Sequence, residues 1–109
     1  MGLDKMSAMI VASIQSAGLD GQVKLISKEL AGVERLEVTR KLDTDTRYVR
    51  VTPIADAGRA WDFEVLGGCY GNLNPNDDFD GRCGGDGDYV LGVIRRWLFE
   101  FIPWNESIL

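Results

Sequence analysis

The residues with the clearest chemical potential lie in a segment rich in Gly and Asp, residues 67–88. Within it, Asn76-Asp77-Asp78-Phe79-Asp80-Gly81 matches the opening of a calcium loop, where oxygen ligands alternate and a glycine permits the sharp turn. The second half departs from that pattern, because Gly87 stands where a bidentate glutamate is required. A bound Ca²⁺ or Mg²⁺ ion would have as its ligands Asp78, Asp80 and Asp86. The alternative is an exposed loop in which Asn, Asp and Gly serve only the turns.

Enzyme chemistry lacks several of its usual parts in this chain. The sequence contains no histidine, which excludes Ser-His-Asp and Cys-His catalysis. Gly67-Gly68-Cys69-Tyr70-Gly71 follows a predicted strand, as phosphate-binding loops do, but it lacks the Gly-Lys-Ser/Thr ending. The carboxylates of the acidic segment could still act as acids and bases, so an enzyme that uses carboxylates is retained as a third hypothesis. We expect a protein that is not an enzyme.

The cellular compartment is predicted from the same residues. The first residues do not form a secretory signal, and no apolar run approaches the ~20 residues of a membrane-spanning helix. We therefore expect a cytoplasmic protein with no membrane contact. In that compartment Cys69 and Cys83 are expected to be reduced thiols, although a disulfide between them would close a loop of about 15 residues.

The charge of the chain is concentrated in one region. There are 17 acidic and 12 basic residues, for a net charge of -5. Residues 60–88 hold seven of the acidic residues and one basic residue, Arg82, so this region accounts for the whole negative excess. Such a balance opposes direct binding to nucleic acid or to an anionic membrane, and it favours a protein partner with a basic surface.

Two surfaces could make that contact. In the acidic loop, aromatic side chains would anchor the partner while the aspartates steer it. Beyond Pro103, the apolar residues could pack back on the domain or form an edge for a partner or a homodimer. The predicted partner-binding residues are Tyr70, Asp77, Asp78, Phe79, Asp80, Asp86 and Trp104.

The elements that position these residues follow from hydrophobic periodicity. Apolar residues at spacings of three and four predict a helix over residues 4–17, with Asp4 as its N-cap and Gly18 as its stop. Residues 20–31 fit a second, shorter helix, although Val23 and Leu25 would also suit a strand. Alternating residues then predict three strands, around residues 33–39, 48–52 and 61–65. A final helix is expected over residues 89–102, with Asp88 as its N-cap.

These elements predict a single α+β domain over residues 1–109. A three-stranded antiparallel sheet would carry the N-terminal helix (or two helices) and the C-terminal helix on one face, with the long Gly/Asp-rich loop before the last helix. Trp97 and Phe101 are expected in the core. Arg35, Lys41 and Arg50 would share the outer face of the sheet with acidic residues, and we expect cross-strand pairs of opposite charge there.

The sequence thus favours a small acidic protein-binding module. Small acidic domains without catalytic groups are often inhibitors, or accessory proteins of phages and mobile elements, and this chain has that profile. The main alternative is a domain that binds Ca²⁺, Mg²⁺ or a small molecule, the latter in a pocket lined by Trp61 or Trp97. No cofactor is otherwise expected.

Overall fold

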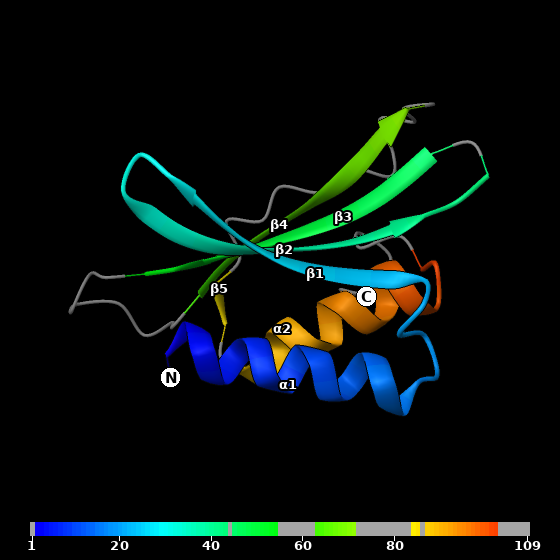
Figure 1. Ribbon diagram of the computed structural model, residues 1–109, viewed down its shortest axis with the longest axis horizontal. Coiled ribbons are helices and arrows are strands. Elements are labelled where there is room, and N and C mark those ends of the chain that lie inside the picture. Colours follow the sequence, from blue (N-terminus) through cyan, green and yellow to red (C-terminus); the bar gives the residue numbers. More distant parts are fainter. Residues whose placement is uncertain (1, 44, 55–62, 72–83, 86, 103–109) are drawn as a thin grey trace.

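The computed structural model describes residues 2–43, 45–54, 63–71, 84–85 and 87–102 (Figure 1). Its sheet is antiparallel, and neighbouring strands are consecutive in the chain, in the order β1-β2-β3-β4-β5. The long strands are β1 (Val23–Leu30), β2 (Val33–Lys41), β3 (Asp45–Pro53) and β4 (Phe63–Gly71). A two-residue strand, β5 (Gly84–Gly85), pairs with the start of β4. The α+β class is confirmed, but the sheet has four long strands and not three.

The N-terminal helix, α1 (Leu3–Ser16), forms where the apolar periodicity predicted it. Met6, Ile10 and Ile14 recur every four residues and are buried. Gly18 ends the helix with a φ of 70°, which glycine adopts without steric cost. Gly2 and not Asp4 occupies the N-cap position. Asp4 lies in the first turn, where its carboxylate favours the positive end of the helix dipole.

The segment predicted as a second helix is strand β1, so the helix was wrong and the strand that stood as its alternative is confirmed. β1 pairs along its whole length with β2, from Val23 opposite Arg40 to Leu30 opposite Val33. Ala31 and Gly32 join the two strands, and both have positive φ, 54° and 81°. Positive φ at both central residues is typical of the two-residue hairpin turns whose twist matches that of the flanking strands.

The last helix also differs from its prediction. It begins as α2 (Gly87–Ile94) and continues as a π-helix, η2 (Arg95–Phe99). Asp88 lies in the first turn of α2 and is not its N-cap. Regular helix ends before Ile102, because Phe101 takes a left-handed φ of 58°. The helix therefore begins two residues before the predicted Tyr89 and ends before the predicted Ile102.

The core lies between the sheet and the helices, which all cover the same face (Figure 1). Trp97 is fully buried, as expected, and its indole N–H donates to the carbonyl of Gly68 at 3.3 Å. Phe101 was expected in the core but is 39% exposed, because its left-handed backbone carries it off the helical stripe. The largest fully buried side chains are Trp97, Phe63, Met6, Ile10, Ile94 and Leu98.

Candidate binding surface

The face of the sheet away from α1 and α2, here called the open face, has no helix over it in the described part of the chain (Figure 1). Side chains alternate between the two faces of a strand, so the pairing register assigns each residue to a face. One cross-strand row of the open face runs over four strands. Its members are Ile26, Glu37, Arg50 and Leu66.

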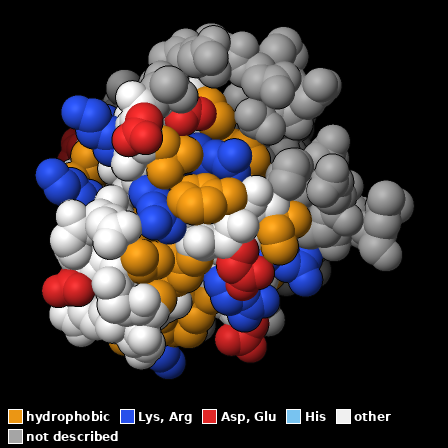
Figure 2. Space-filling view, turned by 90° about the vertical axis from the view of Figure 1, so that its right-hand side faces the viewer, with side chains coloured by type: hydrophobic (Ala, Val, Ile, Leu, Met, Phe, Trp, Pro, Cys, Tyr) orange, Lys and Arg blue, Asp and Glu red, His pale blue; other side chains and the backbone are white. Residues whose placement is uncertain are grey.

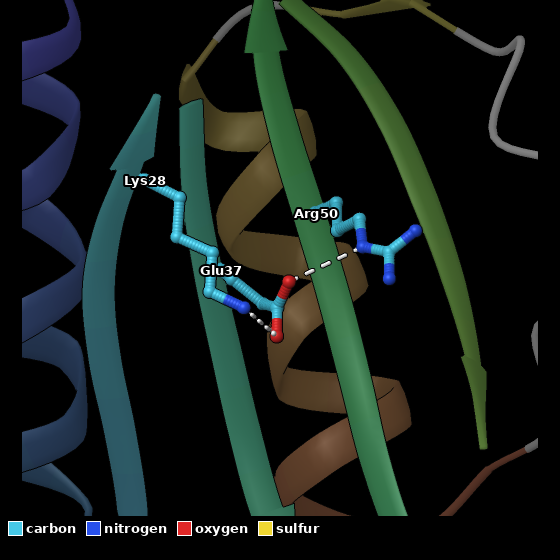
Figure 3. Close-up of polar contacts among 3 residues, drawn as sticks. All are labelled: Lys28, Glu37 and Arg50. Atoms are coloured by element: carbon cyan, nitrogen blue, oxygen red, sulfur yellow. Dashed lines mark hydrogen bonds and ion pairs between the residues drawn. The ribbon is translucent and has the colours of Figure 1, made fainter. Parts of the chain in front are cut away.

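At the centre of this row, Glu37 is held between two cations. Lys28 Nζ lies 3.4 Å from Oε1 of Glu37, and Arg50 Nε lies 3.2 Å from Oε2, so each carboxylate oxygen meets its own positive group (Figure 3). The Glu37 side chain is only 5% exposed, whereas those of Lys28 and Arg50 are 46% and 25% exposed. The carboxylate is therefore buried beneath its two partners and not beneath a helix. The expected cross-strand pair of opposite charge is confirmed for Glu37 and Arg50.

Apolar and aromatic side chains flank this charged centre. Ile26 and Leu66, at the two ends of the row, are 44% and 37% exposed. The guanidinium of Arg50 also lies over the ring of Tyr48, 4.7 Å from its centroid. Contacts on both sides thus hold Arg50 in place. Protein interfaces are enriched in Tyr and Arg, and their most important residues combine such anchors with apolar neighbours.

A groove of about 400 Å³ lies between α1 and β1, along the edge of the sheet. β1 is the first strand of the sheet, so in the described chain it has a strand neighbour on one side only. Val11, on the α1 side of the groove, is 39% exposed. The residues that line the groove are Val11, Ile14, Gln15, Asp20, Val23, Lys24, Leu25 and Ile26.

At one end of the sheet, two arginines bind the last carbonyl groups of the C-terminal helix. Arg40 Nη1 donates to the carbonyl of Leu98 at 2.9 Å, and Arg47 Nη1 donates to that of Trp97 at 3.2 Å. Arg47 also stacks on the Trp97 ring at 4.1 Å, and Arg40 stacks on Phe101 at 4.5 Å. Figure 2 shows basic and hydrophobic side chains interleaved on this side of the molecule. Because cations favour the negative end of a helix, this cluster has a structural role that accounts for both arginines.

Residues 72–83 and 86 of the acidic segment predicted as a site lie outside the described residues. Tyr70 belongs to β4, but its side chain is outside that description. Seven other predicted residues lie wholly outside the described chain: Asp77, Asp78, Phe79, Asp80, Asp86, Trp61 and Trp104. The metal site and the acidic contact surface therefore stay predictions. So does the state of the cysteines, since Cys69 is buried on β4 and Cys83 is outside the described chain.

Two absences concern the part of the chain that the structure describes. No three Asp, Glu or Cys side chains of this part lie close enough together to hold a metal ion. No helix in this part is long and apolar enough to cross a membrane.

Sequence reasoning missed the groove because residues 20–31 were expected to be helical. It also missed the burial of Glu37. Glu37 alternates with Leu36 and Val38, and this pattern correctly places it on the outer face of the sheet. The pattern does not show that a lysine from β1 and an arginine from β3 cover the Glu37 carboxylate. Recognising β1 as a strand would have supplied the signal, since Lys28 then falls on the same face as Glu37.

The chain was compared with known proteins at three levels. No family model, no curated protein and no solved structure matches it. Its function must therefore be inferred from its own residues and geometry.

Proposed function

We propose that this protein is a protein-binding module without catalytic activity, and that it contacts its partner through the open face of the sheet. The observation that carries the proposal is the row formed by Ile26, Glu37, Arg50 and Leu66. Two apolar side chains, more than a third exposed, flank an ordered ion network on a face that no described helix covers.

Preorganisation is the physical reason to favour binding. Ordering long side chains at an interface costs about 0.5–1.5 kcal/mol for each chain immobilised. Glu37 and Tyr48 already hold the guanidinium of Arg50, so much of this cost is met during folding. Apolar side chains beside a fixed guanidinium resemble the centre of a protein interface more than a solvated surface.

The test is affinity capture from the source cells with matched variants of the full chain. Leu66→Asp should abolish capture of the partner while leaving the melting temperature nearly unchanged, because Leu66 is partly exposed in the free protein. Ala12→Asp is the control, since Ala12 is exposed on α1, which covers the opposite face of the sheet. Capture that survives Leu66→Asp and Arg50→Glu alike would refute a contact through this face.

The acidic segment supports a second contact within the same function. A partner with a basic surface would be steered by Asp77, Asp78 and Asp80, and we propose the inhibitor or accessory role on that basis. Replacing all three by Asn should slow association and abolish salt-sensitive binding. If the triple variant binds normally while Leu66→Asp does not, the partner contacts the open face and not the acidic segment.

A further inference from the structure

The first strand of the sheet has an outer edge without a strand neighbour in the described chain. The N–H of Val23 donates to the carbonyl of Leu19 at 2.8 Å, so it points away from β2. Successive residues of a strand direct their backbone groups to opposite sides, so Leu25, Ser27 and Glu29 share that outward direction. Such an edge offers a row of donors and acceptors to an added strand.

We propose that β1 accepts an extended segment of a partner protein as an additional antiparallel strand, and that this segment carries apolar residues between two acidic residues. The inference rests on the proposed function, because it specifies how a protein partner is bound. Backbone hydrogen bonds would supply the affinity, and alternate side chains would supply the selectivity.

The groove selects the side chains of the added strand that point toward α1. Residues opposite Leu25 and Ser27 lie on the helix-covered side of the sheet, as Leu25 itself does. There the groove is lined mainly by apolar side chains, with Val11 and Ile14 on its helix side. Aliphatic residues at these two positions would bury apolar surface on both partners.

Charge selects the side chains on the other side. Lys24, Ile26 and Lys28 alternate onto the open face, so two cations flank one exposed apolar residue along the edge strand. Residues of opposite charge that lie directly across from each other stabilise a strand pair. Such cross-strand neighbours always lie on the same face of the sheet. The preferred segment therefore reads acidic, apolar, apolar, apolar, acidic, with its first residue opposite Lys28 and its fifth opposite Lys24.

The same charges oppose pairing with a second copy of this chain. Two copies of β1 centred on Ile26 would place Lys24 opposite Lys28 of the second copy, twice. A register centred on Ser27 would instead set Leu25 against Glu29. Lysines on an edge strand are a common means of preventing self-pairing, and here they leave the edge to an acidic partner.

The test uses a fluorescein-labelled peptide, Glu-Val-Val-Val-Glu flanked by Gly-Ser, and the full chain, with binding measured by fluorescence polarisation. We expect saturable binding that is more than tenfold tighter than that of the Lys-Val-Val-Val-Lys peptide. Methylating the backbone nitrogens of the second and fourth residues should weaken binding more than tenfold, because these residues face β1. Binding of either comparison peptide as tight as that of the first, or no saturable binding of the first, would overturn the inference.

The register has its own test. The variant Lys24→Glu should bind the first peptide several-fold more weakly and recover affinity for Glu-Val-Val-Val-Lys but not for Lys-Val-Val-Val-Glu. Lys41→Glu carries the same change of charge on exposed residue 41 of β2 and should bind as the unaltered chain does. Recovery by both mixed peptides, or by neither, would contradict the register. Lys24 has no part in the Glu37 network, so folding of its variant is not at issue.

Light scattering and partner capture separate this inference from the proposed function. A dimer that Lys24→Glu stabilises or breaks would show that the edge serves a second copy, which overturns the acidic-segment inference. Peptide binding that fails while Leu66→Asp still abolishes partner capture would remove the edge contact and leave the open-face contact standing.

Discussion

Removing the Arg50 cation from above Glu37 should lower the free energy of unfolding more than removing the Glu37 carboxylate itself. Glu37 is the buried member of the network, whereas Lys28 and Arg50 reach solvent. In Arg50→Met, Glu37 loses the 3.2 Å contact and keeps only a half-exposed lysine at 3.4 Å. In Glu37→Met, the side chains of Lys28 and Arg50 can both rotate so that their charged groups are solvated. An apolar replacement of similar volume at a buried ionic site is often neutral or stabilising, whereas removal of one partner is not.

The magnitudes follow from the exposures. A hydrogen bond to a charged group contributes about 1.5–3 kcal/mol, and the 25% exposure of Arg50 reduces this, so we expect Arg50→Met to lower the unfolding free energy by about 1–2 kcal/mol. For Lys28, which is 46% exposed, solvent screening reduces the loss to about 0–0.5 kcal/mol. Glu37→Met should change stability by less than about 1 kcal/mol in either direction.

Urea unfolding followed by tryptophan fluorescence measures all three variants and the Glu37→Met/Arg50→Met double variant. The double variant should be close in stability to Glu37→Met alone, because without the Glu37 carboxylate Arg50 no longer compensates a buried charge. The coupling energy of the cycle should then be about 1 kcal/mol or more. An Arg50→Met variant no less stable than Lys28→Met, or a Glu37→Met variant that is the least stable of the three, would refute this account of the buried charge.

Three further predictions concern stability and use the same unfolding assay. Ala31→Gly should stabilise the protein by about 0.5–1 kcal/mol, because a left-handed φ of 54° strains alanine, and Gly32→Ala should destabilise it. Arg47→Met should cost about 1–2 kcal/mol through loss of the cap on the Trp97 carbonyl and of the stack on its ring, and a cost below 0.5 would contradict that role. Trp97→Phe should cost about 2 kcal/mol, since the Gly68 carbonyl loses its buried donor; an unchanged urea midpoint would argue against that hydrogen bond.

The elements that sequence reasoning predicted well are those whose signal is local. α1 has three core residues at one spacing and a glycine stop, and apolar residues alternate with polar ones at Leu36 and Val38 of β2 and at Val49 and Val51 of β3. β1 was harder because Val23, Ile26 and Leu30 happen to fall at helical spacing. Ile26 is an apolar residue on the open face, so it contributes to a helical pattern without belonging to the core.

The candidate surface depends on contacts that no local pattern contains. Burial of Glu37 requires side chains from three strands, and the π-helical turn and left-handed Phe101 coincide with arginines about 50 residues earlier in the chain. A prediction from periodicity describes one element at a time. It cannot report which side chain of a neighbouring element covers a charge or caps a carbonyl.

The order of the strands has a consequence for folding during synthesis. β1 to β4 emerge from the ribosome in the order in which they pair, so hairpins can form by local contacts while the nascent chain grows. The helix-covered face behaves differently, because α2 and η2 are translated after all four of these strands. Until then α1 is the one helix of the described chain that is available to shield Val38, Val49 and Val51. A nascent chain that exposes β4 but not α2 outside the ribosome should therefore display a paired sheet with an uncovered apolar face, which is a substrate for chaperones.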